Sequence, residues 1–248
     1  MENSILTVSG LNVRYGSLHA VQDVSFDVKA GEIFGLLGPN GAGKTSTLSA
    51  IEGLLRPQSG QVHIAGYDIR QQPLLAKANM GVQLQSTSFQ PELTVAEIVS
   101  LYAGLYGVEP RLEKLGEIPP HKKMSELSGG QQQRVSLLIT TIHNPKLVLL
   151  DEPTTGLDPQ SRRNLWEKIE AIRENGNGVV LTTHSMEEAE AVCDRLAIID
   201  HGRVLTIDTP EGLIEKYRDD PEVVSVSRKG KITLEDVFIA LTGRAVRF

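Results

Sequence analysis

A glycine-rich octapeptide at residues 38–45, Gly-Pro-Asn-Gly-Ala-Gly-Lys-Thr, limits the possible folds of this chain more than any other segment. It follows the apolar run 33–37, which predicts a strand, and it precedes a helix expected from Gly43 to about Gly53. Glycines at these spacings let backbone N–H groups turn inward around phosphate oxygens, and the positive end of the following helix points at them. An ordinary glycine-rich turn is the alternative, but the flanking strand and helix favour a nucleotide-binding loop.

Two side chains of this loop have expected chemical roles. Lys44 would neutralise the β- and γ-phosphates, and the Thr45 hydroxyl would be a ligand of Mg²⁺. The residues predicted to bind the nucleotide from the loop and the start of its helix are Gly38, Asn40, Gly41, Gly43, Lys44, Thr45 and Ser46.

A second group of polar residues follows two later apolar runs. Asp151 and Glu152 come directly after the run 147–150, and His184 follows the run 179–183. An Asp-Glu pair at a strand end is ordinarily a solvated loop, and a lone histidine there is ordinarily a loop residue. Downstream of a phosphate loop, however, we expect Asp151 to hold Mg²⁺ and Glu152 to act as general base toward the attacking water. His184 closes its strand where it could reach the γ-phosphate, and the other five histidines are scattered and receive no role.

The order of the predicted elements indicates the fold class. Strands expected over 5–15 and 21–28 come first, and later strands alternate with helices. Such alternation implies a mostly parallel sheet covered by helices on both faces. We therefore predict an α/β protein with a P-loop NTPase core, an N-terminal antiparallel β region and a short helical subdomain.

Several local patterns place further elements. Residues 94–97 and 185–188 have the Thr/Ser-x-x-Glu form of a capping box at a helix start. Further helices are expected from about 129, over 159–174, after 209–210 and over 234–242, whereas 223–227 is expected as a strand. The segment 107–126 is poor in apolar residues, and we interpret it as an insertion or the edge of a subdomain.

Net charge, cysteine content and the lack of long apolar stretches limit the partners, metal sites and cellular location expected for this chain. The net charge is −6, and no basic stripe is visible, so we expect no nucleic-acid partner. Cys193 is the only cysteine, which excludes an internal disulfide and a multi-cysteine metal site. No basic segment followed by an apolar run marks a signal peptide, and no apolar stretch approaches the roughly 18 residues of a membrane span. We expect a cytoplasmic chain.

The segment Leu127-Ser128-Gly129-Gly130-Gln131 separates the possible nucleotide-binding classes. A GTPase would carry an Asn-Lys-x-Asp motif, which the sequence lacks, and a small-molecule kinase remains possible on the phosphate loop alone. Ser128 and Gln131 also form a plausible helix capping box. Placed between a phosphate loop and an Asp-Glu strand end, the segment nevertheless resembles the signature of ATP-binding cassette (ABC) ATPases.

Further motifs match this family in order over residues 4–210. Tyr15 resembles the aromatic residue that stacks on adenine, and Gln85 resembles the glutamine that senses Mg²⁺ and the attacking water. Gln83 competes with Gln85, but the spacing from Gly81 favours Gln85. Residues 156–158, ending at Asp158, resemble the loop that communicates across a dimer, and His184 resembles the switch histidine.

The resemblance implies a mechanism. Two cassettes would pair head to tail and enclose two ATP molecules, as a homodimer or as a heterodimer with a second ABC ATPase. Glu152, His184 and Gln85 would be catalytic, and Thr45, Gln85 and Asp151 would hold Mg²⁺. Ser128 and Gly130 would complete the nucleotide site of the opposite subunit, and Gln131 and Asp158 would also bind nucleotide.

The resemblance also implies partners and a location. Segments 101–107 and 234–243 resemble the ATPases of ABC-2-type exporters, whose membrane-spanning subunit is a separate chain. The chain would then power export from the cytoplasmic face of the cell membrane as a peripheral subunit. A soluble ABC ATPase acting on DNA or ribosomes is the alternative, and a regulatory module without turnover is a third possibility that the intact motifs disfavour.

The resemblance sets the domain limits and shows two departures. The ABC ATPase domain would span 4–230 with its helical subdomain at about 86–145, and 231–248 would form a helical tail. The stretch from Gln85 to Ser128 is shorter than in typical members, trimmed around 109–123, and the region before Leu234 is also shortened. The helical subdomain normally forms part of the groove for the membrane partner.

Overall fold

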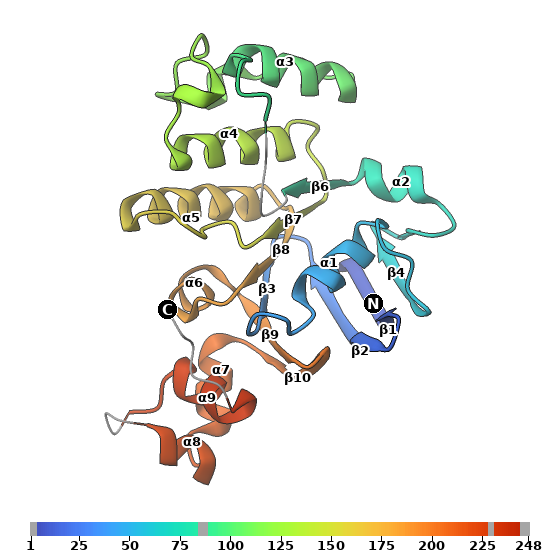
Figure 1. Ribbon diagram of the computed structural model, residues 1–248, viewed down its shortest axis with the longest axis vertical. Coiled ribbons are helices and arrows are strands. Elements are labelled where there is room, and N and C mark those ends of the chain that lie inside the picture. The colour runs from blue at the N-terminus through green and yellow to red at the C-terminus, as the bar shows by residue number, and fades with distance from the viewer. Residues whose placement is uncertain (1–3, 84–88, 228–230, 244–248) are drawn as a thin grey trace.

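A six-stranded sheet forms the centre of the protein. The computed structural model describes residues 4–83, 89–227 and 231–243 (Figure 1). The sheet order is β10-β9-β3-β8-β7-β6, and all neighbours are parallel except β10, which runs antiparallel to β9. These strands are β3 (Ile33–Leu37), β6 (Met80–Gln83), β7 (Leu147–Asp151), β8 (Gly178–Thr183), β9 (Arg195–Asp200) and β10 (Arg203–Asp208). Strands β3, β7 and β8 are buried along their whole length, as expected where helices cover both faces.

A second, antiparallel sheet is formed by the N-terminal part of the chain, in the order β2-β1-β4-β5. Its strands are β1 (Ser4–Tyr15), β2 (Leu18–Lys29), β4 (Ser59–Ile64) and β5 (Tyr67–Asp68). Apolar side chains of β1 and β2 alternate toward a hydrophobic cluster that also contains Leu48 and Ile51 of helix α1 (Lys44–Ile51). Helix α1 therefore lies between the two sheets, and it begins near the C-terminal end of β3.

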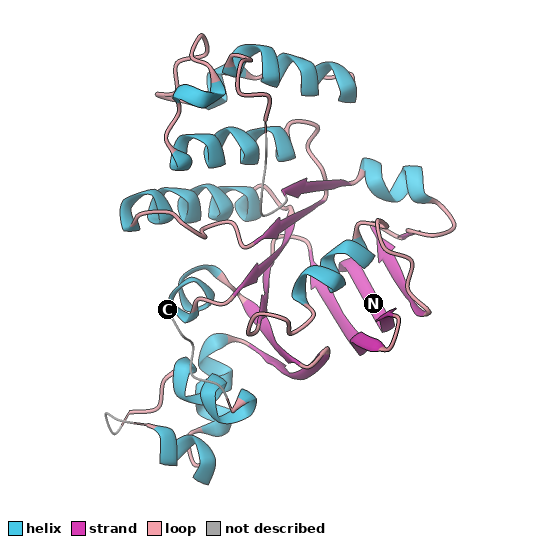
Figure 2. Ribbon diagram, viewed as in Figure 1, coloured by secondary structure: helices cyan, strands magenta, loops and turns pink. Residues whose placement is uncertain are grey.

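The other face of the central sheet is covered by α4 (Gly129–Thr141) and α5 (Pro159–Glu174), which lie side by side (Figure 2). Leu165, Ile169 and Ile172 of α5 pack on β7 and β8, as their helical spacing predicts. Helix α3 (Val95–Tyr106) lies beyond α4, and the two share a separate cluster with the 3₁₀ turns η1 (Leu112–Leu115) and η2 (Met124–Glu126). The segment 107–126 thus contributes to the core of a helical subdomain, through Leu115, Ile118 and Met124.

The C-terminal helices form one cluster at the opposite end of the central sheet. They are α7 (Pro210–Tyr217), α8 (Pro221–Val226) and α9 (Leu234–Thr242), and they lie next to α6 (Met186–Val192). Phe238 of α9 is buried with Leu196 of β9 and with Leu37, the last residue of β3. A short helix, α2 (Pro73–Ala78), precedes β6 on the side of α1. None of the helices within the described ranges is long and apolar enough to cross a bilayer.

The predicted fold class is confirmed, and two local predictions are wrong. Residues 223–227 do not form a strand, because Asp220 caps a helix whose first residue is Pro221. The segment 185–188 forms only half of a capping box: the Ser185 hydroxyl accepts from the Glu188 N–H, but the Glu188 carboxylate turns inward. The prediction also missed α2, β5 and the hairpin β9–β10, whose two-residue turn was visible as His201-Gly202.

Candidate nucleotide site

The glycine-rich loop joins β3 to α1 and borders a hollow of about 840 Å³. Gly43 has a φ of 102°, a left-handed conformation that glycine adopts without strain. A Cβ atom on Gly43 would also overlap the carbonyl oxygen of Ala20, and one on Gly38 would overlap that of Ile199. Because backbone from two other segments packs directly on the loop, only glycine fits at these two positions.

The Lys44 side chain is folded into the loop. Its Nζ donates to the carbonyl oxygens of Gly38 at 2.7 Å and Pro39 at 3.3 Å, and it lies 3.5 Å from Oε1 of Glu152. Burial lowers the pKa of Lys44, and the neighbouring Glu152 and Asp151 carboxylates oppose that effect. The ammonium group therefore lies where the oxygens of a bound phosphate could replace the neutral carbonyl oxygens of the loop as its hydrogen-bond acceptors.

Asp151 and Thr45 face each other across the end of β7. The Thr45 hydroxyl donates to Oδ2 of Asp151 at 3.2 Å, and the Thr182 hydroxyl of β8 donates to Oδ1. Asp151 is only 6% exposed, so these two hydroxyls fix its orientation. A hydroxyl and a carboxylate at this separation are hard oxygen donors of the kind that Mg²⁺ prefers.

Glu152 projects into the hollow from a left-handed backbone conformation, with a φ of 47°. Its N–H donates to the Thr182 hydroxyl at 2.9 Å, which holds this conformation in place. Its Oε2 accepts from Thr155 at 3.3 Å and lies 3.4 Å from Nδ1 of His184. The carboxylate of Glu152 thus lies close to the ammonium of Lys44, the imidazole of His184 and the hydroxyl of Thr155.

The rim of the hollow contains an aromatic side chain at one end. Tyr15 is 49% exposed, and its hydroxyl lies 3.5 Å from that of Ser46, so its ring stands beside the loop. The predicted residues that line the hollow are Tyr15, Asn40, Gly41, Gly43, Lys44, Thr45, Ser46, Glu152 and His184. His19 and His201 also line it, although no motif in the sequence distinguishes them from the other histidines.

Gly38 and Asp151 do not line the hollow themselves, and the predicted residues of α4 and α5 also lie outside it. Ser128 caps α4, and the backbone N–H of Ser128 donates to Gln131 at 3.0 Å while Gln131 N–H donates to Ser128 at 3.3 Å. Gly130 lies against α5, where a Cβ would come within 2.6 Å of the Ser161 hydroxyl. Asp158 caps α5, and its hydrogen bonds with Ser161 hold the pKa of Asp158 below its usual range.

The two candidate glutamines differ in their placement. Gln85 lies outside the described residues. Gln83, its competitor, ends β6 and is 1% exposed, and it does not line the hollow. Neighbouring Gly81 packs against the backbone of Thr140 in α4, and alternate residues of a strand share a face. Gln83 therefore faces α4, away from the glycine-rich loop.

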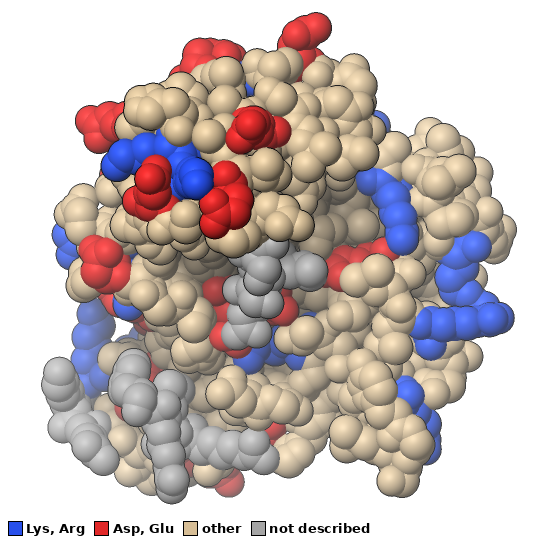
Figure 3. All heavy atoms as spheres, turned by 45° about the horizontal axis from the view of Figure 1, so that its top comes forward, with Lys and Arg blue, Asp and Glu red and all other residues tan. Residues whose placement is uncertain are grey.

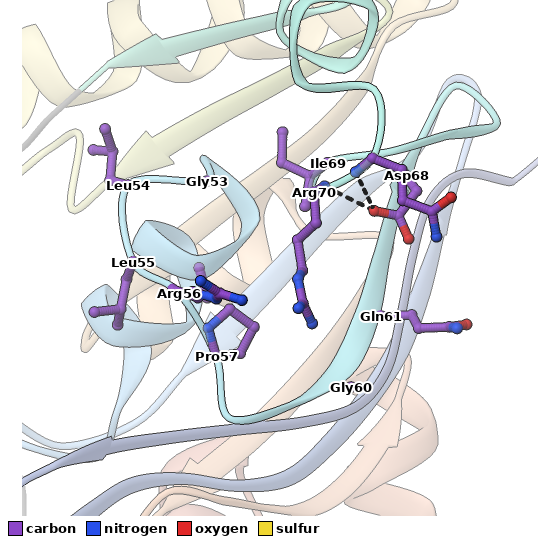
Figure 4. Close-up of a pocket in the computed structure, with 12 residues that line it drawn as sticks. Gly53, Leu54, Leu55, Arg56, Pro57, Gly60, Gln61, Asp68, Ile69 and Arg70 are labelled. Atoms are coloured by element: carbon purple, nitrogen blue, oxygen red, sulfur yellow. Dashed lines mark hydrogen bonds between the residues drawn. The ribbon is translucent and has the colours of Figure 1, made fainter.

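A second hollow, of about 660 Å³, lies at the other end of α1 (Figure 4). Arg56 and Arg70 extend into it from two different segments. The carboxylate of Asp68 accepts from the backbone N–H groups of Arg70 and Gln71 at 2.7 and 3.0 Å. Of the predicted nucleotide-site residues that the structure describes, none lines this second hollow.

Known proteins resemble the chain over almost its whole length. The sequence profile of the family described as "ABC transporter" matches residues 21–155, more than half of the chain. A second profile, described as "AAA domain, putative AbiEii toxin, Type IV TA system", matches residues 123–190. The "Nod factor export ATP-binding protein I" of Burkholderia orbicola (strain AU 1054) is 35% identical, covering 94% of this chain and 95% of that protein. Its counterpart in Rhizobium sp. (strain N33) is 32% identical over 98% of this chain and 99% of that protein.

The Burkholderia alignment spans 291 positions, more than the 248 residues of this chain, so the relative carries residues that this chain lacks. That the missing residues fall around 109–123 and before Leu234 stays a prediction.

Solved structures agree with the sequence comparisons. A structure titled "Structure of ATP binding subunit of ABC transporter" has a TM-score of 0.82 at 27% identity and covers 96% of this chain and 99% of that one. The ATP-binding cassette MJ0796, as a dimer in a post-hydrolysis state bound to ADP and Pi, has a TM-score of 0.73 at 26% identity, covering 82% of this chain and 98% of that one. Its glycine-rich loop and Glu152 line one hollow, and the chain belongs to the ABC transporter family as an ATP-binding and ATP-hydrolysing cassette.

Proposed function

We propose that this chain is the ATPase subunit of an exporter, bound to the cytoplasmic face of the cell membrane through a separate membrane-spanning subunit. The observation that carries the proposal is the meeting of Lys44, Glu152 and His184 in the hollow bordered by the glycine-rich loop. The relatives named Nod factor export ATP-binding protein support export as the direction of transport.

The site residues have distinct proposed roles. ATP would place its adenine beside Tyr15 and its phosphates in the loop, where Lys44 exchanges carbonyl partners for phosphate oxygens. Thr45 and Asp151 would hold Mg²⁺ together with Gln85, and the ion would neutralise charge on the phosphates. Glu152 would accept the proton of the attacking water, with His184 fixing the orientation of its carboxylate.

The position of Ser128, Gly130, Gln131 and Asp158 supports a shared site. These residues stand at the N-termini of α4 and α5, where backbone N–H groups and the helix dipole favour a phosphate. Since they do not line the hollow of their own chain, we propose that they complete the hollow of a second cassette, identical or different.

The surface charge is consistent with a protein partner more than with a nucleic acid. On the face shown in Figure 3, Lys and Arg side chains occur in separate small groups, many of them along the right-hand side, and the acidic groups lie mainly at the upper left. A continuous positive track, which would follow a phosphate backbone, is not present on that face.

Affinity purification from native membranes tests this proposal. Tagged protein extracted in mild detergent is expected to bring down a polytopic membrane protein, and ATPase activity is expected in the eluate. Lys44→Ala serves as the control, because it removes the phosphate contact and is expected to abolish the activity without changing the surface. Recovery with ribosomes, DNA or no partner would contradict the transporter role and favour the soluble alternative.

A further inference from the structure

Glu188 is a buried acidic residue that the proposed mechanism does not use. It lies in the first turn of α6, which starts directly after the loop that carries His184, and its side chain is only 1% exposed. A capping box would direct the carboxylate to the backbone of Ser185, at the surface. The structure places it inside instead, where an unpaired carboxylate would be costly.

Three segments contribute polar side chains around this carboxyl group. The indole N–H of Trp166, in α5, donates to its Oε1 at 3.1 Å. Burial raises the pKa of Glu188, and hydrogen bonds from the Thr183 and Thr154 hydroxyls and from Trp166 oppose the increase, with a smaller contribution from the charge of Arg162. The group is therefore satisfied by partners that are far apart in sequence.

Two of these partners are neighbours of catalytic candidates. Thr183 directly precedes His184, and its hydroxyl also accepts from the N–H of Ser185 at 2.9 Å. Thr154 lies two residues after Glu152, on the loop that leads to α5. One carboxyl group thus connects the loop after β7 with the loop after β8.

We infer that Glu188 is a positioning residue that holds the loops of Glu152 and His184 in register. The contact of 3.4 Å between the Glu152 carboxylate and the His184 imidazole spans these two loops. Rigid placement of a general base to within a fraction of an ångström strongly affects turnover. A hydrophobic residue of similar volume could fill the space of Glu188, but it could not accept a hydrogen bond from Trp166 or from the neighbouring hydroxyls. The inference rests on the proposed roles of Glu152 and His184.

The test replaces the carboxyl group and measures turnover and nucleotide affinity separately. Glu188→Leu is expected to lower kcat for ATP about tenfold or more, with KM within about twofold, because the nucleotide contacts remain intact. Glu188→Gln keeps an acceptor oxygen for Trp166 and is expected to recover most of the activity. Glu190→Leu is the matched control, since Glu190 is exposed on the same helix.

A second readout does not depend on ATP hydrolysis. Trp166 is the only tryptophan of the chain, so its fluorescence emission reports directly on the contact with Glu188. The emission maximum is expected to shift in Glu188→Leu and to stay unchanged in Glu190→Leu. A shifted emission in Glu188→Leu, together with a wild-type protein that has no ATPase activity, would support the contact with Trp166 while rejecting the proposed function.

Two results would overturn the inference: a kcat of Glu188→Leu within twofold of that of Glu190→Leu, or a loss confined to KM. If Glu188→Leu does not fold, Thr154→Val carries the test, because it removes one hydroxyl at constant volume. It is expected to lower kcat by a smaller factor with unchanged KM, and an unchanged kcat would again overturn the inference.

Discussion

At the residue scale, the charges around the glycine-rich loop hold one another in place. Lys44 lies between the carbonyl oxygens of its own loop and the Glu152 carboxylate, and His184 lies on the other side of that carboxylate. Asp151 is oriented by two hydroxyls from β8 and α1. The two adjacent carboxylates therefore have different surroundings, which suits different roles in metal binding and proton transfer.

The role of Glu152 can be tested by a single change. Glu152→Gln is expected to lower ATP turnover by about 100-fold or more, because the amide cannot accept a proton from water. ATP affinity is expected to stay within a few-fold, since the loop and Lys44 remain. Turnover and equilibrium binding should be measured side by side with Glu167→Gln, an exposed position in α5. Undiminished hydrolysis would remove Glu152 from the role of general base.

Glu52 makes stability depend on pH. It ends α1 with its Oε2 buried and no hydrogen-bond partner among the described residues. Burial and the nearby Asp151 charge raise the pKa of Glu52 to about 7, with Lys77 opposing. Below pH 4.5, the pKa of this group in the unfolded chain, the stability that comes with the protonated carboxyl group is fully present. Because the pKa in the folded protein is raised, that stability is lost as the pH rises through about 7.

Glu52→Gln is expected to remove this dependence. Between pH 5.5 and 8, the wild-type protein should lose about 1 kcal/mol more of its free energy of unfolding than the variant, after allowance for solvent screening. Urea unfolding without nucleotide or magnesium measures this difference. If the free energies of unfolding of the two proteins change in parallel between pH 5.5 and 8, Glu52 is ionised throughout this range and the prediction is wrong.

At the element scale, side-chain caps determine where most helices begin. Thr94, Ser128 and Thr233 form reciprocal capping boxes at α3, α4 and α9. The Asp158 and Asp220 carboxylates cap α5 and α8. Because a cap satisfies backbone donors within one turn, it acts locally and can be recognised in the sequence.

The cap of α3 gives a prediction about the helical subdomain. The Thr94 hydroxyl accepts from the N–H of Glu97, and removing it leaves that donor without its partner. Thr94→Ala is expected to lower the free energy of unfolding by about 1 kcal/mol, whereas Thr94→Ser keeps the hydroxyl and most of the stability. Equal denaturant midpoints for the two variants would contradict a stabilising cap.

At the scale of the whole molecule, helix α4 and the glycine-rich loop lie on different sides of the central sheet. Helix α4 lies on the face of the central sheet opposite α1, and its N-terminal Ser128 does not line the nucleotide hollow (Figure 1). If the proposed shared site forms, a single copy of the chain would present two incomplete halves of it. The proposal then predicts turnover in a dimer and ATP binding in a monomer.

Ser128→Arg separates these two activities. The added bulk and charge at the N-terminus of α4 are expected to lower ATP hydrolysis at least tenfold, while ATP affinity of the monomer stays within about twofold. Ser125→Arg makes the same charge change at a nearby exposed position and should retain activity. Full turnover of the Ser128→Arg protein would reject the shared site.

Much of the site was predictable because its chemistry is encoded in short segments. The octapeptide 38–45 specifies both its backbone shape and its lysine, and Asp151 and Glu152 stand at the end of an apolar run. Parallel strands bring their carboxyl ends to one edge of a sheet, so these motifs meet at a place that strand order alone indicates. Helix starts such as Thr94 and Ser128 were predictable for the same local reason.

Contacts between segments far apart in sequence required the tertiary structure. Thr182 orients Asp151 from the neighbouring strand, and nothing near it in the sequence distinguishes it from Thr183. Glu188 matches a surface capping box, yet burial against Trp166 turns its carboxyl inward. The sequence by itself determined which chemical groups are available, because local motifs carry their own geometry. Only packing decided which of them meet, since burial and hydrogen bonding depend on neighbours that the order of residues does not reveal.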